Sequence, residues 1–161
     1  MLKRVVTLAF MMMCVCAWCF VGEASPHDPY LDGDSNYIKC TRHQDLVCYV
    51  DRSSLKVHLY NPPEYIISID MVSVEMNPQM TSYRNRKTGT VLYRYNYDDR
   101  EMYVNTKDYF SNGNDEWMYL EPTAGWAKGG RFVMAGDIAF YLAYNTGFYK
   151  STEKLSDLVD E

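Results

Sequence analysis

Residues 93–105, "YRYNYDDREMYVN", contain two alternating runs of apolar and polar side chains that are separated by two aspartates. Successive side chains of a β-strand point to opposite faces of a sheet, so the pattern predicts two strands joined as a hairpin. With the aspartates at the turn, Tyr95 lies opposite Met102. Two residues further from the turn, Tyr93 lies opposite Val104.

The two faces of this predicted hairpin differ in chemistry. One face carries apolar and aromatic side chains: Tyr93, Tyr95, Met102 and Val104. The other face carries mostly polar side chains: Arg94, Asn96, Glu101 and Tyr103. Because the tyrosines of the first face are matched with aliphatic partners, we expect that face to be core rather than a binding surface. Tyr97 is expected at the edge of the hairpin, stacked on Arg100.

Four further segments have strand patterns. They are residues 46–51 ("LVCYVD"), 55–60 ("LKVHLY"), 64–76 ("EYIISIDMVSVEM") and 116–122 ("EWMYLEP"). Turn-forming residues, "RSS" at 52–54 and "NPP" at 61–63, separate the first three of these segments. Within 64–76 the apolar residues change phase after Met71, which predicts a β-bulge or bend at Met71–Val72.

A helix is predicted after the strands. Residues 131–147, "RFVMAGDIAFYLAYNTG", are apolar on nearly all sides, with alanines at positions 135, 139 and 143. A helix of this kind is buried against a sheet, and Gly147 is placed where a helix C-terminus often has glycine. Strands followed by a helix predict an α+β fold: an antiparallel, meander-like sheet with a C-terminal helix packed across one face.

The N-terminus has the three-part pattern of a secretory signal peptide. A basic start ("MLKR") precedes an apolar run bounded by Val5 and Val21, and the small residues of "GEA" precede a cleavage site after Ala24. The alternative is an uncleaved membrane anchor, since the run approaches the length that spans a bilayer. We therefore expect export to the periplasm or the cell surface of a bacterium, and no later segment is expected to span a membrane.

The predicted boundaries follow from these patterns. They are a signal peptide over 1–24, a flexible lead-in over 25–36, one domain over 37–150 and an acidic tail over 151–161 with a short helix. The chain has a formal net charge of −5, and without residues 1–24 it has 14 Lys and Arg against 20 Asp and Glu. Nucleic acid binding requires a basic surface, so a nucleic acid partner is not expected.

Few residues of this chain have the spacing of a catalytic or metal site. His27, His43 and His58 share no spacing of metal ligands, and no glycine-rich phosphate or dinucleotide motif is present, so neither a metal nor a cofactor is expected. Cys40 and Cys48 are an even pair in a chain predicted to be exported, and we expect them to form a disulfide.

The 15 tyrosines favour binding over catalysis, because tyrosine combines a large contact area with a polar tip. The main hypothesis is a non-enzymatic module that binds a protein or another component of the cell envelope. The second is a small-ligand binder that uses an aromatic cleft between sheet and helix, and the third is an enzyme of unspecified type. Three residues are candidates for binding: Arg94, Tyr103 and Trp126.

Several strings also resemble known proteins. "YVDRSSL", "YNPPEYII", "YRYNYDDREMYV", "EWMYLEP" and "AGDIAFYLAYNTGFYK" are similar, in this order, to strings in small exported proteins of diderm Firmicutes, the relatives of Selenomonas and Veillonella. This resemblance covers about residues 46–150 and implies export and fold. "YVDRSS", the tyrosine-rich strand and "WMYLEP" also resemble the surface-adhesin protein E family, which implies an antiparallel sheet and extracellular partners. That family has a cysteine near its C-terminus, whereas this chain has Cys40 and Cys48.

Overall fold

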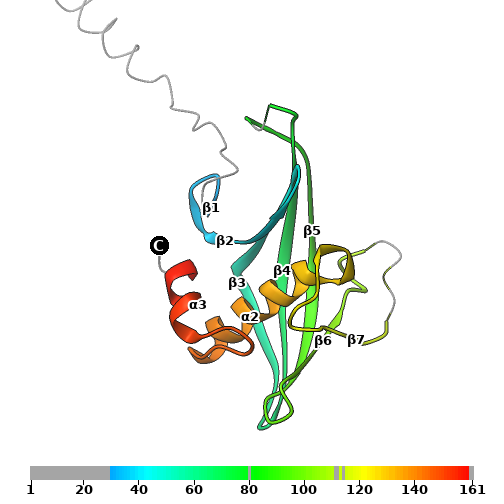
Figure 1. Cartoon of the computed structure of the whole chain (residues 1–161), viewed down its shortest axis with the longest axis vertical. Coiled ribbons are helices and arrows are strands. Elements are labelled where there is room, and N and C mark those ends of the chain that lie inside the picture. The colour runs from blue at the N-terminus through cyan, green and yellow to red at the C-terminus, as the bar shows by residue number, and fades with distance from the viewer. Residues whose placement is uncertain (1–29, 80, 111–112, 114, 160–161) are drawn as a thin grey trace, which may run out of the picture.

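The computed structural model describes residues 30–79, 81–110, 113 and 115–159. In this part of the chain seven strands form one sheet, and each strand pairs antiparallel with the next one along the sequence. Their bounds are β1 (Tyr30–Leu31), β2 (Asp34–His43), β3 (Leu46–Asn61), β4 (Glu64–Met76), β5 (Tyr83–Asn96), β6 (Glu101–Asn105) and β7 (Met118–Tyr119). The predicted antiparallel meander is confirmed (Figure 1).

Helices follow the sheet, as the sequence predicts. A short 3-10 helix, η1 (Trp126–Lys128), leads into α2 (Gly130–Tyr144), and α3 (Thr152–Val159) follows it. The long helix α2 crosses one face of the sheet, while α3 contacts α2 and β2 (Figure 1). Most of the buried apolar side chains lie between α2 and the sheet. The α+β class and the packing of the helix across one face are therefore confirmed. No helix in the described ranges is both long and apolar enough to cross a membrane.

Strands β5 and β6 form the predicted hairpin with the predicted pairing. Tyr95 pairs with Met102, and Tyr93 pairs with Val104. Both tyrosines are fully buried on the face that α2 covers. The turn spans residues 97–100, and the Arg100 Cζ atom lies 4.3 Å from the centroid of the Tyr97 ring. Tyr93 and Tyr95 therefore belong to the core, and the predicted stacking at the edge of the hairpin is confirmed.

Strand β4 passes through Met71–Val72 without the predicted bulge. Its pairing with β5 is continuous across this region. Met71 lies in the main core under α2, whereas Val72 lies in a second buried cluster on the opposite face of the sheet. Leu31 of β1 belongs to that second cluster. The prediction was wrong because the change of apolar phase marks the point where burial passes from one face of a regular strand to the other.

Strand β3 is one bent strand where the sequence predicts two strands and a turn. Its register with β4 shifts between Asp51 and Lys56. The Asp51 carboxylate accepts hydrogen bonds from the amide and the hydroxyl of Ser53, at 2.9 and 2.6 Å. The Ser54 hydroxyl donates to the Asp51 carbonyl at 2.6 Å. These short side chains bond to nearby backbone in a bulge as they do in a turn, so the local pattern did not distinguish the two.

The predicted boundaries change at two places. Tyr30, the first residue that the structure describes, already belongs to the sheet, and Leu31 is only 1% exposed, so the second half of the predicted lead-in belongs to the fold. Helix α2 ends at Tyr144, where Asn145 rather than Gly147 adopts the left-handed conformation, with φ of 52°. Asparagine tolerates that conformation better than most residues. The short helix predicted in the tail is confirmed as α3. The predicted signal peptide, 1–24, lies outside the described residues.

Candidate functional site

The structure brings together two of the three candidate binding residues. Arg94 of β5 and Tyr103 of β6 are cross-strand partners, and the Arg94 Cζ atom lies 4.6 Å from the Tyr103 ring centroid. Trp126 belongs to η1, where its ring stacks on the ring of His43. The candidates therefore mark two separate regions of the surface.

The first region is a group of four side chains that we call the outer aromatic patch: Arg94, Tyr103, Trp117 and Tyr119. The Arg94 Cζ atom also lies 5.4 Å from the Trp117 ring centroid. The rings of Tyr103 and Tyr119 meet edge to face, with their centroids 5.6 Å apart. Because side chains alternate along a strand and Tyr95 faces α2, this patch lies on the face that α2 leaves uncovered.

Polar groups border the outer aromatic patch on the β5–β6 side. The Tyr103 hydroxyl donates to Glu101 Oε2 at 2.9 Å, and this hydrogen bond raises the pKa of Tyr103 above its usual value. A cavity of about 210 Å³ opens beside the pair, and Glu64 and Asn96 also line it. Tyr119, at the other end of the patch, is 48% exposed. The arrangement combines accessible rings with a polar rim, which suits recognition of another molecule.

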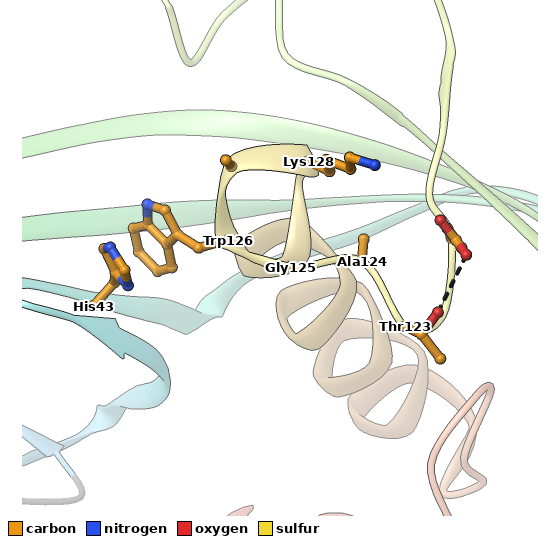
Figure 2. A pocket seen from close by; sticks show the side chains of 8 residues that line it. His43, Thr123, Ala124, Gly125, Trp126 and Lys128 are labelled. Carbon is orange, nitrogen blue, oxygen red and sulfur yellow. Dashed lines mark hydrogen bonds between the residues drawn. The ribbon is translucent and has the colours of Figure 1, made fainter.

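The second region is an open cleft of about 590 Å³ at the connection that precedes α2 (Figure 2). The rings of Trp126 and His43 stack at one end of it, with centroids 5.2 Å apart and planes 18° apart. Lys128 and Thr123 lie away from that stack, and Thr123 donates to a glutamate at 3.2 Å (Figure 2). The stack joins η1 to the end of β2. Trp126 therefore helps to hold the connection in place as well as lining the cleft.

The predicted disulfide is absent from the structure, where Cys40 and Cys48 are free, buried thiols. The pairing of β2 with β3 shifts its register between Lys39 and Thr41. Cys48 is therefore the cross-strand partner of Thr41 and not of Cys40. The Cys40 thiol donates to the Cys48 carbonyl at 3.1 Å, while Cys48 Sγ lies 3.2 Å from the Ser73 hydroxyl. Burial raises the pKa of both thiols. The register shift is a β-bulge, which sequence spacing does not reveal.

Two residues of the outer aromatic patch, Trp117 and Tyr119, were missed as candidates. They stand two positions apart in "EWMYLEP", and that spacing indicates one shared face of a strand. The sequence does not indicate which strand they pair with. In the structure Tyr119 pairs with Tyr103, which completes the patch.

Charged and nucleophilic groups also gather in a smaller pocket beside the N-terminus of α2. Ser73, Lys87, Tyr109 and Arg131 all line it. Among the described residues, no group of three or more histidine, cysteine or acidic side chains is placed to hold a metal ion.

Comparisons of the chain with family models, with curated proteins and with solved structures found no significant match. The resemblance to exported proteins of diderm Firmicutes and to the protein E family therefore stays a prediction. Function has to be inferred from the geometry of the molecule itself.

Proposed function

We propose that this protein is an exported, non-enzymatic binding module whose outer aromatic patch contacts a protein partner. The observation that carries the proposal is the chain of contacts from Trp117 through Arg94 and Tyr103 to Tyr119 on the uncovered face of the sheet. Tryptophan, tyrosine and arginine contribute most to the energy of protein interfaces, because each brings a large contact area. Rings that already hold one another in place also lose little side-chain entropy when a partner binds.

The distribution of charge supports a protein partner over a nucleic acid. The chain has a formal net charge of −5. At the border of the patch Glu64 and Glu101 line the same small cavity as Arg94. A phosphate backbone requires several cations along one surface, whereas a protein surface can match a mixed pattern of this kind.

The interior of the interface between sheet and α2 does not support the small-ligand alternative. The rings of Tyr95, Phe140 and Phe148 lie there with their centroids 4.9 to 5.2 Å apart. All three side chains are almost completely buried. Aromatic rings at these distances are packed as in a protein core, so they leave no room for a ligand between them.

Site-specific crosslinking in the producing bacterium tests the proposal. A photoreactive phenylalanine analogue placed at Tyr119 should crosslink to one protein species. The same analogue placed at Tyr60 should not. Tyr60 is a matched control, because it is a tyrosine that is 67% exposed and contacts Tyr65 and Tyr144 on the side of α2.

Binding measurements with the partner protein that the crosslink identifies, purified separately, complete the test. Arg94→Ala and Tyr103→Ala should each raise the Kd by about tenfold or more, as truncation of interface hot spots does. Tyr60→Ala should leave the Kd unchanged. Equal affinity of all these variants would contradict the proposal. So would the finding that the patch binds an envelope polysaccharide, with the two patch variants abolishing that binding instead.

A further inference from the structure

A pocket separate from the outer aromatic patch opens where the N-terminus of α2 meets the ends of β4 and β5. Its volume is about 180 Å³. Its innermost polar groups are the hydroxyls of Ser73 and Tyr109, whose residues are only 7% and 3% exposed. Buried polar groups require hydrogen-bond partners. A hydrogen that these hydroxyls do not use among themselves is therefore available to a ligand in the pocket.

Ser73 stands in the middle of a chain of three hydrogen-bonding groups. Its hydroxyl is hydrogen-bonded to the Tyr109 hydroxyl and lies 3.2 Å from Cys48 Sγ. Each of these three groups carries one hydrogen, but the two contacts between them use only two hydrogens. One donor is left over. When that hydrogen belongs to Tyr109, which lines the pocket, it is available to an acceptor inside the pocket.

Two cations flank the same pocket. Lys87 Nζ lies 4.6 Å from the Phe110 ring centroid, and Arg131 Cζ lies 5.4 Å from it. Within the described part of the chain, neither cation forms an ion pair. Glu75 also lines the pocket, but its carboxylate is paired with Arg84. The pocket therefore presents two uncompensated positive charges in a chain whose net charge is negative.

We propose that this pocket binds a small organic carboxylate, with its charge held by Lys87 and Arg131 and its apolar part against Phe110. A guanidinium group matches a carboxylate with two parallel hydrogen bonds, and the Tyr109 hydroxyl supplies a further donor when it carries the spare hydrogen. The N-terminus of α2, which has no acidic residue in its first turn, adds positive potential. The volume is below the roughly 300 Å³ at which drug-sized sites begin, so the ligand is the size of benzoate.

Titration of the purified protein with benzoate, followed by the amide resonances of Ser73 and Arg131, tests the proposal. Benzoate should cause saturable shifts that weaken as salt is added, because salt screens the two cations. Benzyl alcohol has the same ring without the charge, and benzylammonium has the opposite charge. Neither of these probes should cause saturable shifts. Inorganic phosphate should bind more weakly than benzoate, because it has no apolar part.

Substitutions of Lys87 and Arg131 test whether these two cations bind the benzoate. Lys87→Met and Arg131→Met keep side chains of similar length over the ring and should each raise the Kd for benzoate by about tenfold. Lys56→Met, which removes an exposed cation of β3 outside the pocket, should leave the Kd unchanged. Thermal unfolding confirms that each variant is folded. Should Arg131→Met fail to fold, Arg131→Lys keeps the charge but loses the two parallel bonds, so it should raise the Kd less.

Four results would overturn the proposal. They are no saturable shift with benzoate, equal shifts with benzyl alcohol, equal affinity for phosphate, and an unchanged Kd in the Lys87 and Arg131 variants.

Discussion

Tyr95 joins the sheet to α2 through both its ring and its hydroxyl. The ring is fully buried, with its centroid 4.9 Å from that of Phe140, and the hydroxyl donates to the Gly136 carbonyl at 2.9 Å. Tyr103 is the same residue type on the next strand but on the opposite face. It is only half-buried, and its hydroxyl donates to Glu101 at the edge of the outer aromatic patch. Tyr95 therefore has a structural role, whereas Tyr103 belongs to the surface that we propose for recognition.

Tyr95→Ala should lower the free energy of unfolding by about 3 to 5 kcal/mol, because a large side chain is lost from a packed core. It also removes the hydroxyl that donates to the Gly136 carbonyl. Tyr103→Ala should cost less than half as much and should act on partner binding instead. Urea melts of the two variants measure this difference. Small and equal losses of unfolding free energy in the two variants would show that Tyr95 does not stabilise the core.

Asp137 is a fully buried carboxyl within α2. Its Oδ1 atom accepts a hydrogen bond from the Tyr149 amide at 2.7 Å, which ties the segment after α2 to the helix. Its Oδ2 atom has no hydrogen-bond partner among the described residues. Burial raises the pKa of Asp137 above its usual range, although the amides of Tyr149 and Lys150 act in the opposite direction. Ionisation of this carboxyl therefore works against the folded state.

Asp137→Asn should remove one part of the pH dependence of stability. Because the folded-state pKa is raised, the wild-type contribution is fully present below the unfolded-state pKa, about 4, and is lost as pH rises through the folded-state pKa. The variant keeps an Oδ1 acceptor for Tyr149 and cannot ionise. Urea melts at several pH values above about 4 should therefore show its stability relative to wild type rising with pH. A difference that stays constant with pH would contradict this.

At the scale of elements, small residues set the distance between α2 and the sheet. Ala135 and Ala139, two of the three alanines spaced four residues apart in the predicted helix, are fully buried, as expected for a helix packed on a sheet. Gly136 is closer still to the sheet. A Cβ atom at this position would lie 2.9 Å from carbons of the Tyr93 ring and closer to the sulfur of Met102. The hairpin and the helix are therefore matched at a residue that has no side chain.

Gly136→Ala should destabilise the protein although alanine is the better helix former. Helix propensity favours the change by about 1 kcal/mol, but forcing a methyl group into a packed interface costs about 1 to 3 kcal/mol. Gly125→Ala is the control, because a Cβ atom there meets nothing within 4 Å and the residue has an ordinary φ of −70°. Thermal unfolding should show a lower Tm for the first variant alone. A higher Tm for Gly136→Ala would show that α2 can move away from the sheet at no cost.

At the scale of the whole molecule, the two faces of the sheet are used differently. One face is covered by α2 along the main core, and on the other face the described apolar core residues gather at the end where Leu31, Tyr49 and Val72 form the second cluster. The outer aromatic patch occupies the part of that face that these clusters leave open. This division leaves the outer aromatic patch available to the proposed partner.

The predicted export of this protein implies a defined N-terminus for the mature chain. Cleavage after Ala24 should yield a protein that begins at Ser25, because small residues precede that bond and an apolar run precedes them. N-terminal sequencing of protein from a bacterial periplasm measures this. Ala24→Pro should block cleavage at that bond and serves as the control. A wild-type chain that begins at Met1 and stays in the membrane fraction would show that the apolar run is an anchor.

The sequence by itself determined the features that depend on neighbouring residues. The period of two in 93–105 predicted the hairpin, its pairing and its buried face, because alternation and hairpin closure are local properties of the backbone. The apolar pattern of 131–147 likewise predicted α2. The same local pattern was ambiguous at 52–54, since the turn-forming serines fit a bulge as well as a turn.

Only the tertiary structure decided which distant residues meet. The outer aromatic patch requires Tyr119 to pair with Tyr103, and that pairing joins strands separated by a long connection. The pocket proposed to bind a carboxylate requires α2 to place Arg131 beside Ser73 and Lys87, which depends on how the helix packs on the sheet. The free thiols of Cys40 and Cys48 lie beside a bulge in the pairing of β2 with β3. Pairing, packing and bulges are set by the energy of the whole core, so no short window of sequence contains them.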